Sequence, residues 1–258
     1  MIANYHTHTI RCRHASGSER EYIETAISRG VKLLGFSDHS PQLFPAGYYS
    51  NYRMFPEETE NYFETIRSLA DEYRSDITIL AGLETEYFPE LFDSLIEFLT
   101  PYSPDYLILG QHYIDNEYDT RRYSGNPNSD ESALKRYVDQ TLEALGTRKF
   151  SCFAHPDLIN YTKSSSIWER EMRRLCEGAK RLGVPLEINL LGLSEDRHYP
   201  RADFWRIAKE TGNEVILGCD AHQPERVAVP GELEKAKAFV DAIGLEPLET
   251  LKLIPPCE

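Results

Sequence analysis

Short apolar runs alternate with longer amphipathic segments along the chain. The runs have the length of strands and predict strands over Ile2–His6, Leu33–Ser37, Ile77–Glu84, Tyr106–Gly110, Phe150–Ala154, Leu186–Asn189 and Glu214–Gly218. Helical spacing of apolar residues predicts helices near Arg20–Arg29, Glu57–Tyr73, Leu91–Leu99, Glu131–Leu145, Trp168–Leu182, Ala202–Thr211 and Glu232–Ile243. Several of the strands are apolar throughout, which is typical of strands in a buried parallel sheet. The alternation therefore predicts parallel βα units.

The order of these elements favours an α/β barrel over an open sheet. Right-handed crossovers curl a parallel sheet, and single α/β barrels commonly run to about 250 residues. The chain has 258 residues, and no linker rich in Pro, Gly and Ser divides it. We therefore expect one domain over residues 1–258, with irregular closure because the pattern yields seven units where the common barrel has eight. The polar, turn-rich segment Asn116–Asp130 is expected to form a long loop over one end of the barrel.

The acidic composition narrows the classes of partner. The chain carries 28 Lys and Arg against 42 Asp and Glu, for a formal charge of −14. Such a surface repels nucleic-acid phosphates, so we expect a small-molecule substrate and no long nucleic acid. No apolar run approaches the roughly 20 residues that cross a bilayer, and no basic leader opens the sequence. We therefore expect a cytoplasmic protein with no membrane partner, whereas the oligomeric state stays open.

Histidines and carboxylates follow the predicted strands. His6 and His8 close the first strand, and Asp220 and His222 come just after the seventh. Because the carboxyl ends of parallel strands in a barrel share one face, residues more than two hundred positions apart should meet there. The candidate ligands that this argument brings together are His6, His8, His14, His39, Glu84, His112, His155, Asp220 and His222.

These residue types together favour metal binding. Imidazoles and carboxylates suit Zn²⁺, Mn²⁺ or Fe²⁺, and nine donors exceed what one ion can use. Two or three divalent ions sharing a bridging carboxylate is therefore the expected stoichiometry. A single histidine at a strand end is more often structural, but seven clustered imidazoles without a metal would leave ring nitrogens unpaired. Glu86 competes with Glu84 for the bridging role, since both would face the same side of a strand.

The ordered motifs resemble a known superfamily. They are His6-Thr7-His8, Ser37-Asp38-His39, Gly82-Leu83-Glu84, Gln111-His112, Ala154-His155-Pro156 and Asp220-Ala221-His222. The series is similar to the polymerase and histidinol phosphatase (PHP) superfamily. His14-Ala15-Ser16-Gly17 and Gly218-Cys219-Asp220-Ala221-His222 resemble its histidinol-phosphate phosphatase branch most. The resemblance runs from His6 to His222 and implies a distorted seven-stranded (β/α) barrel with a trinuclear metal centre at the carboxyl ends of the strands.

The resemblance also implies a division of the ligands. One ion would take His6, His8, Glu84 and Asp220, with Glu84 bridging to a second ion; His112 and His155 would hold that second ion, and His14, His39 and His222 a third. Asp38, beside His39, would orient an imidazole as a hydrogen-bond acceptor. The alternative for Asp38 is a turn-forming or solvated carboxylate.

A phosphate-binding arginine is expected after the sixth strand. The stretch from Asn189 to Pro200 resembles one in the family, in which relatives commonly place Arg directly after Gly-Leu. Ser194 occupies that place here, and Arg197 follows three residues later. Arg197 is the first candidate for a catalytic, phosphate-binding residue because its planar fork suits a phosphate dianion. The alternative is a surface salt bridge with Glu195 or Asp196.

Other charged residues have weaker assignments. Arg121 and Arg122 are possible lid residues, although an exposed charged loop is the simpler interpretation. Glu86, Asp115 and Asp157 are candidate partners for the cationic part of a substrate.

The activity implied is metal-dependent hydrolysis of a phosphate monoester, most closely L-histidinol phosphate to L-histidinol and phosphate in histidine biosynthesis. A hydroxide bridging two ions would attack phosphorus in line. The sequence contains no Walker A loop, Rossmann glycine fingerprint or G-x-S-x-G elbow that would indicate other chemistry. Two alternatives stay open: a related phosphoesterase acting on a nucleoside bisphosphate or a DNA 3′ end, and a catalytically silent metal-binding module, which the complete ligand set disfavours.

Overall fold

The computed structural model describes residues 1–119 and 122–257. Within these ranges, one parallel sheet has its strands in the order β1-β2-β3-β4-β7-β8-β9. They are β1 (Ala3–Asn4), β2 (Leu33–His39), β3 (Thr78–Thr85), β4 (Leu107–Leu109), β7 (Cys152–Phe153), β8 (Leu186–Asn189) and β9 (Val215–Gly218). A separate antiparallel pair consists of β5 (Tyr113–Ile114) and β6 (Arg122–Tyr123). The order along the large sheet follows the order along the chain, as successive βα units require.

The sheet curls until its first and last strands almost meet. Just beyond β1 and β9, Thr7 and Ala221 form a parallel bridge, in which the amide of His8 donates to the carbonyl of Ala221 at 2.9 Å. The amide of Cys219 also donates to Oδ1 of Asn4 at 2.9 Å. The predicted seven-stranded (β/α) barrel with irregular closure is therefore confirmed.

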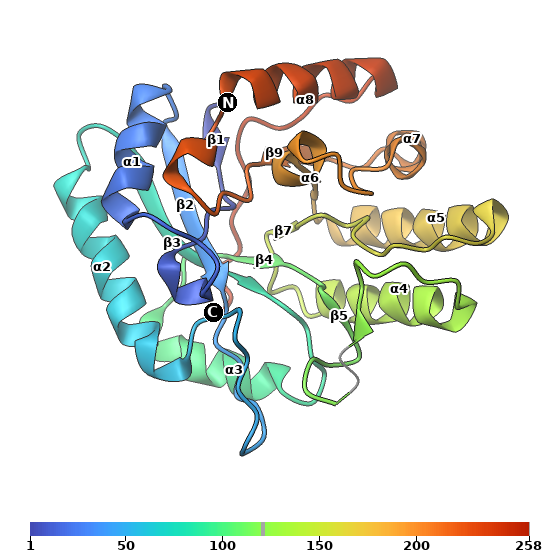
Figure 1. Cartoon of the computed structure of the whole chain (residues 1–258), viewed down its shortest axis with the longest axis horizontal. Helices are drawn as coiled ribbons and strands as arrows, with labels where there is room; N and C mark the ends of the chain where they lie inside the picture. Colours follow the sequence, from blue (N-terminus) through green and yellow to red (C-terminus); the bar gives the residue numbers. More distant parts are fainter. Residues whose placement is uncertain (120–121, 258) are drawn as a thin grey trace.

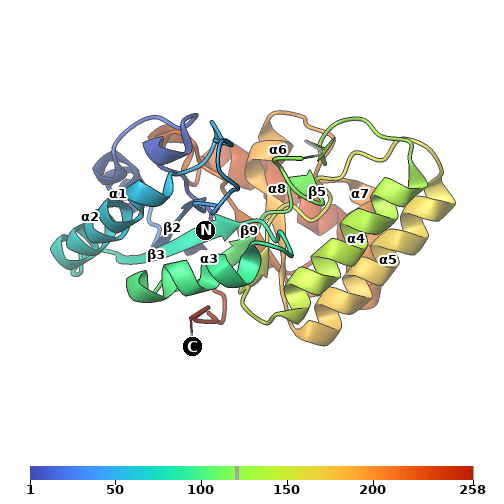
Figure 2. The same ribbon diagram turned by 90° about the horizontal axis from the view of Figure 1, so that it is seen from below.

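Helices surround the sheet on all sides (Figure 1). They are α1 (Glu19–Ser28), α2 (Thr59–Glu72), α3 (Phe92–Leu99), α4 (Glu131–Gly146), α5 (Ser165–Leu182), α6 (Leu190–Ser194), α7 (Ala202–Thr211) and α8 (Pro230–Ile243), with 3₁₀ turns η1 (Ile10–Cys12), η2 (Pro56–Glu58), η3 (Thr100–Tyr102) and η4 (Pro224–Arg226). Figure 2 shows α4 and α5 running side by side. Helix α1 begins with a capping box, in which Ser18 and Glu21 satisfy each other's backbone amides.

The strands bury both faces. In β3, Ile79, Ala81 and Leu83 pack into the large core shared with the helices, whereas Leu80 packs against the smaller core cluster. Tyr106 belongs to that second cluster, and its hydroxyl donates to the carbonyl of Tyr5 at 2.8 Å. Because side chains alternate along a strand, Glu84 lies on the same face of β3 as Leu80. At the carboxyl end of β3, the Glu84 side chain therefore lies on the face of the strand that packs against the smaller core cluster.

Several local features differ from the predictions: β1 and β7 are shorter than predicted, and β5, β6 and α6 were not predicted. The Asn116–Asp130 segment is not wholly a loop, since β6 lies within it; a two-residue strand is too short to give a periodic pattern. Helix α6 was not predicted, and it begins because the Asn189 side chain accepts from the amide of Gly192 at 2.8 Å.

Arg121, a candidate lid residue, lies outside the described residues. In the part of the chain that is described, no helix is long and apolar enough to span a membrane.

Candidate metal centre

All nine predicted ligands gather at the carboxyl ends of the strands. Seven of them line a cavity of about 340 Å³: His14, His39, Glu84, His112, His155, Asp220 and His222. His6 and His8 lie beneath it and are fully buried. The loops after β1, β4, β7 and β9 and the ends of β2 and β3 thus bring together residues from positions 6 to 222. No predicted ligand lies away from the cluster.

Glu84 occupies the centre of this cluster. Its Oε1 lies 2.9 Å from Nε2 of His155, and its Oε2 lies 3.0 Å from Nδ1 of His39. Ring nitrogens of three further histidines approach the carboxylate to between 3.5 and 3.6 Å: His6, His8 and His112. Gly110 makes room for it, because a Cβ there would come within 2.1 Å of Oε1. One carboxylate therefore faces imidazoles from four segments of the barrel, a position suited to a carboxylate shared between two ions.

Asp220 closes the other side of the cluster. Its Oδ1 lies 3.2 Å from Nε2 of His8 and 3.4 Å from Nδ1 of His222. Beyond it, Nε2 of His222 lies 2.9 Å from Nε2 of His14. Asp220 and His155 have positive φ angles of 50° and 32°. Residues other than glycine rarely adopt such angles, and they persist mainly where surrounding structure holds a functional side chain in place.

The donor atoms fit metal ions. Nε2 of His6, both ring nitrogens of His8 and Oε2 of Glu84 are buried without a hydrogen-bond partner among the described residues. Buried polar atoms are costly when unpaired, and a cation between these lone pairs would satisfy them. Trios of donors within 4.8 Å of one another are His6, His8 and Glu84; His6, His155 and Asp220; His39, Glu84 and His112; His14, His39 and His222; and His8, Cys12 and His222. The trios overlap, which favours more than one ion.

The trio of His14, His39 and His222 matches one group of the division that the resemblance implied. His112 and His155 both approach Oε1 of Glu84, at 3.6 and 2.9 Å, and His155 also lies in a trio with His6 and Asp220. The division of the ligands among the ions therefore stays a prediction.

The charges of the cluster favour cations. Burial raises the pKa of Glu84, but His112, His39 and His6 outweigh it and hold that pKa well below its ordinary value. Burial likewise raises the pKa of Asp220, and His6 and His8 lower it further than burial raises it. Both carboxylates are therefore ionised at neutral pH, and they offer negative charge to a metal.

Carboxylates behind the cluster orient two of the imidazoles. Oε2 of Glu187, on β8, lies 2.7 Å from Nδ1 of His6, and Oε1 of Glu86 lies 2.9 Å from Nδ1 of His112. In each case Nδ1 donates, which turns Nε2 toward the cavity. Glu187 was not among the residues predicted from the sequence. The available signal was a charged residue between Leu186 and Ile188 in a wholly buried strand.

A buried arginine holds Glu86 in place. Arg53 is 1% exposed, and its guanidinium binds Glu86 and lies 2.6 Å from Oε2 of Glu117. Tyr52 donates to Oε1 of Glu86 at 3.0 Å. Glu86 is therefore occupied by protein groups, and its predicted role as a substrate partner is wrong. Nothing in the sequence around Arg53 distinguishes it from a solvated loop residue.

Two further candidate partners also face protein groups. Oδ1 of Asp115 lies 2.6 Å from Nε of Arg136. Oδ2 of Asp157 accepts from the amide of Arg201 at 2.5 Å, and burial raises the pKa of Asp157 to about 7. Neither residue lines the cavity.

The Asp38 carboxylate lies beside the ring of His8, and His39, its neighbour in sequence, contacts it through the backbone amide. Its Oδ1 accepts from the backbone amide of His39 at 2.9 Å and lies 3.5 Å from Nδ1 of His8. Its Oδ2 accepts from the hydroxyl of Thr9. The imidazole beside the Asp38 carboxylate is therefore that of His8, at a distance too long for a hydrogen bond of normal geometry, and the predicted orienting role stays a prediction.

Arg197 lines the cavity. Its Nη2 lies 2.7 Å from Oε2 of Glu195, and its Nη1 donates to the hydroxyl of Tyr199 at 2.8 Å. Both interpretations made from the sequence are compatible with this position, so phosphate binding stays a prediction. Arg122, in contrast, lies 3.5 Å from Asp115 and 3.9 Å from Asp130 and is not among the residues that line the cavity.

Comparisons with known proteins agree with this geometry. The model of the PHP domain matches residues 4–191. A protein of Deinococcus radiodurans named "Probable histidinol-phosphatase" is 28% identical over 241 residues, which cover 88% of each chain. The histidinol-phosphatase of Bacillus subtilis is 28% identical over 253 residues, covering 84% of this chain and 92% of its own.

A solved structure shares the whole fold. The histidinol phosphate phosphatase of Lactococcus lactis, complexed with zinc, L-histidinol and phosphate, matches with a TM-score of 0.74 at 20% identity over 97% of this chain and 98% of its own. The family model covers well over half of the chain and includes seven of the nine clustered residues: His6, His8, His14, His39, Glu84, His112 and His155. The chain belongs to the PHP domain family.

Proposed function

We propose that this protein, as one domain over residues 1–258, hydrolyses L-histidinol phosphate to L-histidinol and phosphate. The observation that carries the proposal is the convergence of nine donor side chains around Glu84, several of their buried atoms lacking a hydrogen-bond partner among the described residues. Relatives named histidinol-phosphatase support the choice of substrate. A role in histidine biosynthesis and a cytoplasmic location follow from the same assignment.

Two or three divalent ions, of zinc, manganese or iron, would be held by the nine residues. Bound there, they would supply Lewis-acid activation of water and of the phosphoryl oxygens. Glu84 and Asp220 offset their charge, and the carboxylates behind His6 and His112 keep Nε2 of each ring directed at the cavity. Asp38 lies 3.5 Å from Nδ1 of His8, too far for a hydrogen bond of normal geometry, and adds negative charge beside that ring. Catalysis would require no protein nucleophile.

Arg197 would bind the phosphate. Its guanidinium lines the cavity with His155, Asp220 and Tyr199, and the Tyr199 hydroxyl fixes one of its nitrogens. Its remaining donors can bind the non-bridging oxygens and stabilise the charge that they carry in the transition state. Glu195 holds the other edge of the guanidinium, and so limits its rotation.

Aromatic side chains would receive the leaving group. Tyr52, Tyr113 and Tyr123 line the cavity together with Leu191. Flat aromatic faces suit an imidazole ring, and π-faces also attract its protonated form and the ammonium group. A cavity of about 340 Å³ suits a small ester more than a polynucleotide.

The test compares three esters on metal-loaded protein: L-histidinol phosphate, a nucleoside 3′,5′-bisphosphate and an aryl phosphate. We expect kcat/KM for L-histidinol phosphate to exceed that for the other two esters by at least about 100-fold. The reason is that only this ester carries the imidazole ring and amino group that the side chains of Tyr52, Tyr113 and Tyr123 would contact. Preference for the bisphosphate would instead assign the chain to a nucleotide phosphoesterase. No hydrolysis of any ester after loading with zinc, manganese and iron in turn would indicate a silent metal-binding module.

A further inference from the structure

Cys12 lies against the centre although the phosphatase mechanism makes no use of it. It ends the short turn η1, which starts two residues after His8. Thr9 caps this turn, accepting from the amide of Arg11, and the turn folds the chain back toward the histidines. The Cys12 side chain is fully buried, in contrast to the exposed Ile10 at the start of the same turn. A polar, nucleophilic atom has therefore been placed in the interior beside the ligands.

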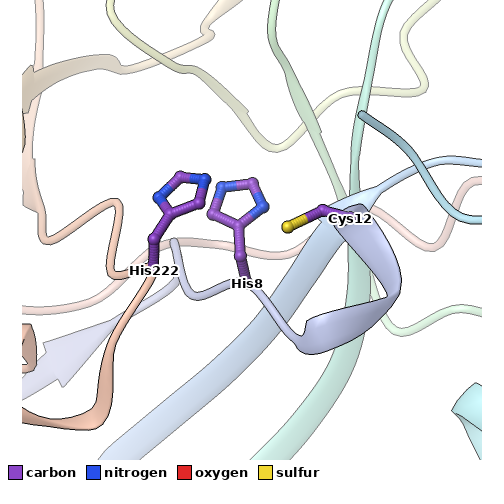
Figure 3. A group of neighbouring side chains, drawn as sticks. All are labelled: His8, Cys12 and His222. Atoms are coloured by element: carbon purple, nitrogen blue, oxygen red, sulfur yellow. The ribbon is translucent and has the colours of Figure 1, made fainter. Parts of the chain in front are cut away.

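The thiol shares a pocket with two imidazoles. Donor atoms of His8, Cys12 and His222 all lie within 4.8 Å of one another. Figure 3 shows the Cys12 sulfur facing a ring nitrogen of His8, with the His222 ring stacked on the far side of His8. His222 also belongs to the trio with His14 and His39, so Cys12 adjoins the corner of the centre where these two trios meet.

A second observation is that the His8 imidazole at this corner has no hydrogen-bond partner among the residues that the structure describes. His8 is fully buried, and neither of its ring nitrogens has a hydrogen-bond partner of normal geometry in the described part of the chain. One of these nitrogens faces Glu84 and Asp220, and the other faces Cys12 and Asp38. An unpaired imidazole beside a buried thiol is a pair of donors that zinc binds in proteins.

We propose that Sγ of Cys12 is a further metal ligand, for an ion in the corner that it shares with His8 and His222. The inference rests on the proposed metal centre and adds a donor of a different kind. On binding, the thiol S–H bond breaks, its proton passes to solvent and a sulfur–metal bond forms. Thiolate donors favour zinc over manganese, whereas carboxylate and imidazole donors accept both. The corner beside Cys12 therefore selects zinc over manganese, whereas the sites around Glu84 accept either ion.

X-ray absorption at the zinc edge tests the proposal on the wild-type protein loaded with zinc to saturation. We expect a sulfur shell at about 2.3 Å beside the nitrogen and oxygen shell at about 2.0–2.2 Å. The cobalt-substituted protein should show a thiolate-to-cobalt charge-transfer band. In Cys12→Ser the sulfur shell and the band should both disappear, and the affinity for one zinc ion should fall by more than the roughly 10- to 100-fold that loss of an outer hydrogen bond costs.

Cys219→Ser is the matched control. Cys219 precedes Asp220, but its sulfur accepts from the amide of Ala228 and contacts Met1. The control should keep the sulfur shell and the charge-transfer band.

A wild-type spectrum that shows only nitrogen and oxygen around zinc would overturn the proposal, whether or not Cys12→Ser folds. Disappearance of the sulfur shell in Cys219→Ser would overturn it equally. These outcomes are distinct from failure of the proposed function, because a saturated protein with zinc–sulfur bonds that does not hydrolyse L-histidinol phosphate would contradict the substrate assignment alone. Absence of zinc binding would contradict both.

Discussion

Oε2 of Glu187 lies 2.7 Å from Nδ1 of His6, and it links the middle of β8 to the loop after β1. Gly218 permits the contact, because a Cβ there would come within 2.1 Å of the same oxygen. The second oxygen of Glu187 accepts from Asn189 at 2.9 Å, so the carboxylate is fixed at both ends. The orientation of a predicted ligand is thus set by a residue 181 positions away.

Replacement of Glu187 should weaken metal binding. Glu187→Ala removes the acceptor for Nδ1 of His6, and we expect the affinity for one ion to fall about 10- to 100-fold. Glu187→Gln keeps an acceptor oxygen, so its loss should be smaller. Titration against a chelating dye measures both. Equal affinity in the alanine variant and the wild type would show that Glu187 does not orient His6.

Removal of Arg53 should destabilise the fold. In Arg53→Ala, Glu86 and Glu117 stay buried without their cation, and loss of one partner of a buried pair costs about 3–5 kcal/mol. Arg136→Ala is the control, because its pair with Asp115 is about one-third exposed and should contribute about 1 kcal/mol or less. Urea unfolding compares the two. Similar losses of stability in both variants would contradict the account of the buried network.

Loss of Arg197 should impair catalysis and leave the metal content unchanged. We expect kcat/KM of Arg197→Gln to fall about 10²- to 10³-fold, as when a donor to transition-state charge is removed. Arg226→Gln is the matched control, because Arg226 lies 2.8 Å from Glu232 and does not line the cavity. Steady-state kinetics with elemental analysis tests the pair. Unchanged kcat/KM in Arg197→Gln would leave Arg197 a surface salt bridge with Glu195.

The metal-free protein should lose stability as the pH rises. Burial lowers the pKa of His6, but Glu187, Asp220 and Glu84 raise it further, to well above 6.5; Asp220 and Asp38 do the same for His8. Their contribution to stability is complete below about pH 6.5 and is lost as the pH rises through the raised folded-state pKa. Burial lowers the pKa of His222 to about 3. The contribution of His222 to stability therefore changes with pH only below about pH 6.5.

Thermal unfolding of chelated protein checks this dependence. We expect Tm to fall as the pH rises above about 6.5, and to change less after metal is added, because ions replace the protons. A Tm of the chelated protein that rises over the same range would contradict the prediction.

Much of the fold was predictable because each βα unit carries a local pattern. Leu186–Asn189 and Ala202–Thr211 have the predicted bounds, since their apolar spacing ends sharply at a cap or a polar residue. The convergence of the nine candidate ligands was also predictable, because it follows from strand direction alone. The short bridge between Thr7 and Ala221 was not, because it depends on how far the sheet curls.

The groups that support the site could not be predicted in the same way. Arg53 lies in a loop, and only the folded chain brings it to Glu86 and Glu117. Asp38 adjoins His39 in sequence but faces His8, since successive residues of a strand point to opposite sides. Cys12 carries no spacing signal, and a 3₁₀ turn decides its direction. Such contacts depend on tertiary distances that no periodicity records.

Anomalous diffraction from crystals of metal-loaded protein, with data above and below the zinc, manganese and iron absorption edges, tests the central claim most directly. The account predicts two or three anomalous peaks within the cluster, at least two of them within bonding distance of Glu84. Fewer than two peaks in the cluster, or peaks confined to surface carboxylates, would contradict it.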